Sequence, residues 1–117
     1  MVARAPDEQR IASLITTGQA VLAVMRADRA GDLFHRQGEF QEYQGGMLRA
    51  LVSIDGHILV TTETFPRQHG WLVTSALVEN GAELGVRVVT DDAGNEAVLP
   101  HEGALAFARG EPLDFPQ

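Results

Sequence analysis

Two residue types are missing from this chain of 117 residues, and each absence excludes a group of functions. Cysteine is absent, which rules out disulfides, thiolate zinc sites, iron–sulfur clusters and cysteine nucleophiles. Lysine is also absent, because all nine basic residues counted with lysine are arginines. The chain therefore has no lysine for a Schiff base, for covalent pyridoxal phosphate or for a Walker A phosphate site.

Positive charge is scarce. Sixteen acidic residues against nine arginines give a net charge of −7 and a pI near 4.9. The arginines are scattered and form no basic patch, so nucleic acid is not an expected partner. The acidic residues are scattered too, and no acidic run is longer than Asp91-Asp92. We therefore expect the negative net charge to keep the protein soluble and not to serve a binding function.

Long apolar runs are also missing. No stretch approaches the roughly 20 apolar residues of a membrane span, and residues 1–8 lack the apolar core of a signal peptide. We expect a cytoplasmic protein with no membrane partner. The length predicts a single domain over residues 1–117, with irregular tails at 1–5 and 110–117, and folding should bury roughly two thirds of the unfolded surface.

Two dipeptides predict β-hairpins. Asp55-Gly56 and Asn80-Gly81 each lie between apolar runs. A two-residue type I′ turn needs positive φ at both central positions, which Asp or Asn tolerates and Gly accepts freely. The first turn pairs residues 48–54 with 57–63, and the second pairs 71–79 with 82–90. A helix over residues 71–79, ending just before Gly81, is the alternative to the second hairpin.

The first hairpin is apolar on both faces. Val52 and Leu59 belong to one face, and we predict that the other face points outward. Its apolar residues are Met47, Leu51, Ile58 and Val60. A strand pair that is apolar on both sides is usually covered on both sides. A helix can cover one side and a second molecule the other, so these four residues are the predicted protein interface.

An amphipathic helix is predicted at the N-terminus. Pro6 suits a first helical position, and the acidic pair after it suits a first turn. The apolar residues that follow recur with a helical period, namely Ile11, Leu14, Ile15, Val21, Leu22 and Met25. Gly31 is the predicted end. Because Thr16-Thr17-Gly18 weakens the middle, the alternative is a short helix to about Thr16 and a strand over residues 19–27.

The remaining segments complete the predicted fold. Residues 31–46 hold four glycines and three aromatic rings and are predicted to form a loop or an edge strand. A turn at 91–95 should return the chain as a strand over 96–99, and residues 103–109 form a last short element of undecided type. The predicted fold class is α+β: an N-terminal amphipathic helix packed on a curved antiparallel meander sheet of about five strands.

No catalytic or metal-binding pattern is found in the sequence. The four histidines, His35, His57, His69 and His101, have no metal-ligand spacing, so no metal site is predicted. The three serines lie on the predicted helix and strands, and none is in a G-x-S-x-G setting. No glycine-rich phosphate loop is present in a strand-to-helix setting, so no cofactor is expected.

One segment combines side chains that suit ligand binding. Residues 64–71 include Arg67, His69 and Trp71 and connect the two predicted hairpins. Arginine offers a donor fork for an anion, and tryptophan offers a flat surface for stacking. Together with His57 they are the predicted residues of a site for an anion or a planar ligand. The alternative is a plain connection with a core tryptophan.

Two functional hypotheses follow. The first is a small non-enzymatic interaction or regulatory module, either a homodimer through the outer face of the 47–64 hairpin or a complex with another protein. The second is a small-molecule binding protein or an acid–base enzyme, with a cup-shaped sheet and the 64–71 segment at its mouth.

Overall fold

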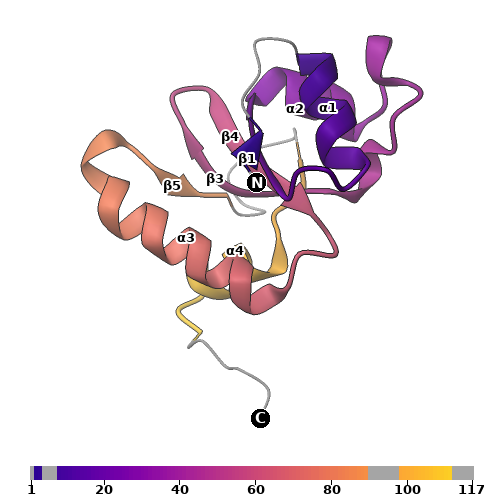
Figure 1. Ribbon diagram of the computed structural model, residues 1–117. Coiled ribbons are helices and arrows are strands. Elements are labelled where there is room, and N and C mark those ends of the chain that lie inside the picture. Colours follow the sequence, from indigo (N-terminus) through magenta and orange to yellow (C-terminus); the bar gives the residue numbers. More distant parts are fainter. Residues whose placement is uncertain (1, 4–7, 90–97, 112–117) are drawn as a thin grey trace.

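The computed structural model describes residues 2–3, 8–89 and 98–111 and has an α+β fold (Figure 1). The helices are α1 (Glu8–Thr16), α2 (Ala27–Phe34), α3 (Arg67–Gly81) and α4 (Glu102–Ala108), with single 3-10 turns at Gly38–Phe40, Gly45–Met47 and Ala82–Leu84. The strands are β1 (Val2–Ala3), β2 (Leu22–Arg26), β3 (Leu48–Ile54), β4 (His57–Thr62) and β5 (Arg87–Val88).

The strands lie in the order β1-β2-β4-β3-β5. Four of them, β2, β4, β3 and β5, form the antiparallel part of the sheet, whereas the two-residue β1 runs parallel to β2. The expectation of a meander of about five antiparallel strands therefore holds only in part, because one strand is parallel and the strand order is not sequential. The segment between β2 and β3 folds into α2 and two 3-10 turns, so that the returning strand β4, and not β3, pairs with β2.

One face of the sheet carries the main core. The side chains of Ile58 and Val60 on β4 and of Met25 on β2 are buried there together with residues of α1, α2 and the first 3-10 turn. The buried partners from these elements are Ile11, Ala12, Ile15, Ala30, Leu33 and Phe40. Burial of this continuous apolar cluster is the main stabilising contribution on this side.

The β3–β4 hairpin forms at the predicted turn. Asp55 and Gly56 have φ values of 48° and 77°, as a type I′ turn requires. Next to the turn the observed pairs match the predicted ones, including Val52 with Leu59. Beyond them the register shifts at a β-bulge between Ala50 and Val52, so that the rest of β3 pairs one residue away from the prediction.

The predicted second hairpin is wrong, because residues 67–81 form α3. Gly81 packs against Val86, where a Cβ atom would overlap the valine side chain, and Gly70 approaches α4 in the same way. Tertiary packing therefore uses these glycines inside a helix, which outweighs their low helix propensity. The αL residue that ends the helical segment is Gly85, with φ 86°. Only the returning strand is partly recovered, as β5.

The predicted N-terminal helix is correct only in its first half. Helix α1 ends at Thr16, and Gly18 adopts φ 80°, a conformation that favours glycine. The chain then enters β2, as the alternative interpretation had it. Gly31 does not end a helix but is buried inside α2. Residues 31–46 therefore hold the end of α2 and two 3-10 turns and form no edge strand.

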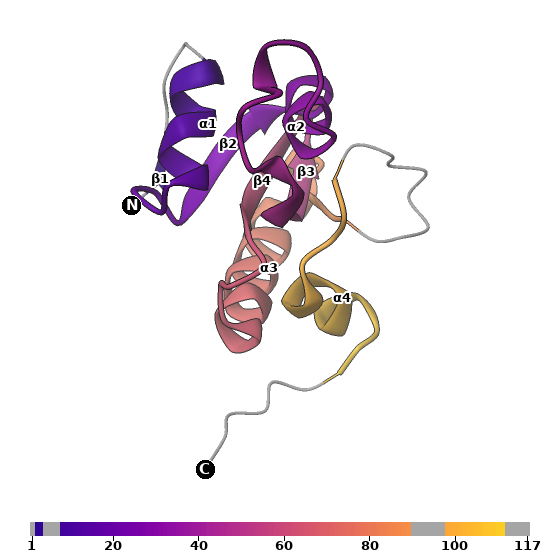
Figure 2. The ribbon, with the colours of Figure 1, turned by 90° about the vertical axis from the view of Figure 1, so that its right-hand side faces the viewer.

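The last described segment joins the sheet and then packs on α3. Residues 96–97 of the predicted final strand lie outside the described residues. The chain that follows these residues pairs with β3: the backbone amide of Ala50 donates to the Leu99 carbonyl, and the Ala50 carbonyl accepts from the His101 amide, both at 2.8 Å. The undecided element is α4, which lies beside α3 (Figure 2). The two helices approach closely at Gly70 and Gly103, because a Cβ atom at Gly103 would overlap the backbone of α3.

Candidate functional site

An apolar groove lies between the sheet and α3, on the sheet face opposite to α1 and α2. It encloses about 470 Å³. Strands β2, β3 and β4 provide one side, and α3 with the segment before β5 provides the other. The residues that line it are Leu22, Val24, Val52, Ile54, His57, Ile58, Leu59, Val73, Ala76, Leu77 and Val86. Of these, only His57 has a titratable side chain.

The alternation of side chains along the strands explains this lining. In β2 the side chains of Ala23 and Met25 are buried in the core, so Leu22 and Val24 point to the groove. Helix α3 packs against β3 and β5 and leaves the β2 side of the groove open. Val24 and Leu77, on the two banks of the groove, are therefore each 38 % exposed.

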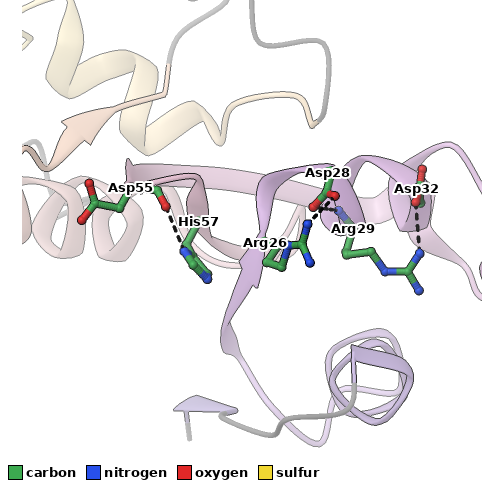
Figure 3. Close-up of polar contacts among 6 residues, drawn as sticks. All are labelled: Arg26, Asp28, Arg29, Asp32, Asp55 and His57. Atoms are coloured by element: carbon green, nitrogen blue, oxygen red, sulfur yellow. Dashed lines mark hydrogen bonds and ion pairs between the residues drawn. The ribbon is translucent and has the colours of Figure 1, made fainter.

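Charged residues gather at one end of the groove. Arg26 is the cross-strand neighbour of His57, and both are exposed. A terminal nitrogen of Arg26 lies 2.9 Å from a carboxylate oxygen of Asp28, while Nδ1 of His57 lies 3.1 Å from the backbone oxygen of Asp55 (Figure 3). Figure 3 shows the Arg26 and His57 side chains next to each other, and the Asp55 carboxylate directed away from the imidazole.

The predicted interface residues are not on an outer face. Leu51, Ile58 and Val60 are at most 1 % exposed, and this chain itself covers them. Met47 is half-buried in a 3-10 turn. The reason is that α1 and α2 cover the face of the hairpin that was expected to be open. Leu51 lies at the bulge, between Ala50 and Val52, and is buried as well. The open face is the one that carries Val52 and Leu59.

The residues of the 64–71 segment do not form a joint site. Arg67 forms an ion pair with Glu111 at 2.9 Å, and the indole nitrogen of Trp71 donates to the backbone oxygen of the same Glu111. His69 is exposed beside the Phe65 ring. These residues begin α3 and attach the segment after α4 to it. His57 lies elsewhere, at the end of the groove.

His101 is the histidine that sequence reasoning missed. It is 1 % exposed, its Nε2 lies 2.7 Å from the Phe65 carbonyl, and its Nδ1 accepts from the Gly103 amide at 3.0 Å. The acceptor role of Nδ1 places the proton on Nε2. Burial lowers the pKa of His101, against smaller raising effects of the Phe65 carbonyl and of Glu102. Its only signal in the sequence was its position next to the short element of undecided type at residues 103–109.

A second hollow of about 450 Å³ lies beside His101. It contains the ion pair of Arg49 with Glu63 at 3.1 Å and the exposed Glu102. His101 reaches this hollow with both ring nitrogens already bonded to the backbone, so it has no free nitrogen for proton transfer to a ligand. This hollow is therefore a weaker candidate than the apolar groove.

Residues 2–3, 8–89 and 98–111 contain no group of three or more histidine, aspartate or glutamate residues placed to hold a metal ion. In the same part of the chain, no helix has the length and apolar character needed to cross a bilayer.

The chain shows no significant match to any protein-family model, curated protein or solved structure with which it was compared.

Proposed function

We propose that this protein is a small non-enzymatic binding module that takes up an apolar small molecule in the groove between the sheet and α3. The observation that supports this proposal is the groove itself, a hollow of about 470 Å³ lined by apolar side chains and by His57. Small-molecule sites are typically hollows of about 300–1,000 Å³, mostly apolar, with a few polar groups that orient the ligand.

The lining predicts how affinity depends on the ligand. Each buried methylene contributes about 0.8 kcal/mol, which corresponds to about a fourfold change in affinity. Affinity for a series of linear alcohols should therefore rise by about fourfold per methylene until the chain fills the groove, and then level off. Nonspecific binding to an exposed apolar surface would show no such limit on the length of the alcohol.

Displacement of a fluorescent probe tests this proposal. Phenylnaphthylamine is neutral and becomes bright in apolar surroundings, so bound alcohols are read from the loss of its fluorescence. We expect saturable binding at one site per chain, with the chain-length limit described above. Failure of phenylnaphthylamine and of every alcohol to bind at one saturable site would contradict the proposal.

Two leucines of α3 provide a matched pair of variants. Leu77 is 38 % exposed and lines the groove, whereas Leu72 is 42 % exposed and does not line it. Leu77→Gln should weaken binding by about tenfold, because it replaces apolar lining by an amide. Leu72→Gln removes a similar apolar surface from the same helix and should leave binding unchanged. Equal effects of the two substitutions would locate the ligand outside the groove.

A second candidate function is self-association through the same groove. Val24 and Leu77 favour it, because exposed apolar side chains on both banks of a hollow can pack against a second copy. This candidate keeps the hypothesis of a homodimer but moves it to the other face of the hairpin. Sedimentation velocity tests it: a dimer that Leu77→Gln dissociates and Leu72→Gln preserves would support it, and a strict monomer at micromolar concentration would rule it out.

A further inference from the structure

We infer that the groove binds an amphiphile with one linear apolar chain and an anionic head group, and that Arg26 binds the head group. This inference rests on the proposed function and specifies its ligand class. It comes from the position of Arg26, which is the cross-strand neighbour of His57, a lining residue at the end of an otherwise apolar hollow.

The strand register places both basic side chains at the same end. Leu22, Val24 and Arg26 alternate on β2 with the buried Ala23 and Met25, so Arg26 lies on the groove side of the strand. Its cross-strand partner His57 lines the groove directly. Figure 3 shows the two side chains side by side.

Arg26 retains donors for a ligand. The ion pair with Asp28 uses one terminal nitrogen of Arg26, and a guanidinium carries five N–H donors in all. His57 does not add a donor, because the Asp55 carbonyl can only accept: Nδ1 carries the proton, and Nε2 of the neutral ring is an acceptor. Arginine and a carboxylate form charge-assisted hydrogen bonds, which are about twice as strong as those between neutral groups.

Two nearby acids do not cancel this preference. Asp28 shares Arg26 and so competes with a ligand for the same guanidinium. The Asp55 carboxylate points away from His57 in Figure 3. The remaining N–H groups of Arg26 are therefore the donors at the groove end, inside a chain whose overall charge is −7. Anionic ligands are selected by this local donor group and not by the overall field.

The groove also indicates the shape of the ligand. Its lining continues along β2 from Leu22 toward Arg26, a distance of about 13 Å at the usual rise per strand residue. A linear chain laid along β2 contacts Val24 on one side and Val73 and Leu77 on the other, with its head group at Arg26. Fused ring systems with charges on several sides would not fit this one-ended distribution of polar groups.

Three probes with the same chain and different head groups test the inference. Dodecanoate is anionic, dodecanol is neutral and dodecyltrimethylammonium is cationic. Each is used to displace phenylnaphthylamine from the full chain, the two ions below their micelle concentrations and dodecanol below its solubility limit. We expect dodecanoate to bind about tenfold more tightly than dodecanol, the effect of one exposed charge-assisted hydrogen bond, and the cation to bind most weakly. Equal affinities of dodecanoate and dodecanol would overturn the inference.

Substitutions at the head-group end separate this inference from the proposed function. Arg26→Gln should reduce the preference for dodecanoate and leave dodecanol binding unchanged. Asp28→Asn should increase the preference, because it removes the competing carboxylate from Arg26. Arg10→Gln removes the same charge from an exposed position on α1, on the other side of the sheet, and should change nothing.

The outcomes are distinct. If dodecanol binds and Arg26→Gln keeps the full preference for dodecanoate, the head-group site is wrong and the groove proposal stands. If Arg10→Gln and Arg26→Gln reduce dodecanoate binding equally, the preference reflects overall charge and the inference is overturned. If none of the three probes displaces phenylnaphthylamine, the proposed function itself fails. Circular dichroism of each variant shows whether it is folded, and the Asp28→Asn gain cannot arise from unfolding.

Discussion

Three side chains around α3 depend on partners far along the chain. Arg67 and Trp71 both bond to Glu111, so their donors are already used inside the fold. The burial of His101 depends on Gly70 and Gly103, which meet across two helices.

The buried His101 predicts a specific pH dependence at the residue scale. Its pKa is lowered in the folded state, mainly by burial, while in the unfolded chain it is about 6.5. Below pH 6.5 the unfolded chain therefore binds more protons than the folded one at this residue. The contribution of the neutral His101 to the free energy of unfolding is complete above pH 6.5. It is lost as the pH falls from there through the lowered pKa of His101 in the folded state.

Urea unfolding followed by the fluorescence of Trp71, the only tryptophan, measures this effect. His101→Asn keeps an acceptor for the Gly103 amide but loses the bond to the Phe65 carbonyl, so it should cost about 1–3 kcal/mol at neutral pH. The variant should then lose less stability than the wild type between about pH 7.5 and about pH 5. Equal losses in both proteins, which would come from other titrating groups, would contradict the role given to His101.

At the scale of elements, local rules succeeded where nothing distant opposed them. The Asp55-Gly56 turn was predicted correctly because its backbone requirement concerns two residues only. The same turn rule failed at Asn80-Gly81, because Gly81 is the last residue of α3 and packs against Val86 beyond the helix. The continuous N-terminal helix failed at Gly18, where the chain turns toward β2 and a strand partner became available in β4. The α+β class was therefore predictable, while the boundary between helix and strand was not.

Two leucines of the β3–β4 hairpin predict unequal effects of the same substitution. Leu51, at the bulge, is fully buried, whereas Leu59 faces the groove and is partly exposed. Leu51→Ala should lower the free energy of unfolding by about 2–5 kcal/mol, the usual cost of truncating a buried leucine. Leu59→Ala should cost clearly less, because part of its side chain already contacts solvent. Urea unfolding of both variants checks this order, and the reverse order would mean that Leu59 is the more deeply buried of the two leucines.

At the scale of the whole molecule, the groove brings together segments that the sequence keeps apart. Its lining comes from β2, β3, β4, α3 and the residue before β5. The sequence correctly indicated that the 47–64 hairpin is apolar on both faces. Which face stays open depends on where α1, α2 and α3 pack, and this is a property of the complete fold. The sequence therefore predicted that the candidate site lies on this hairpin, but it assigned the site to the side chains of the opposite face.

The two candidate occupants of the groove cannot bind at the same time, and this predicts the behaviour of the whole molecule. A small molecule and a second copy would both cover Val24 and Leu77, so filling the groove must oppose self-association by mass action. Sedimentation equilibrium with and without saturating dodecanoate, below its micelle concentration, measures the competition. We expect a monomer with the ligand bound, and any dimer present without the ligand should dissociate over the range of dodecanoate that displaces phenylnaphthylamine. A dimer that persists with a filled groove would have to use another surface, such as the exposed Leu84 or Leu99, and the groove would then serve the ligand alone.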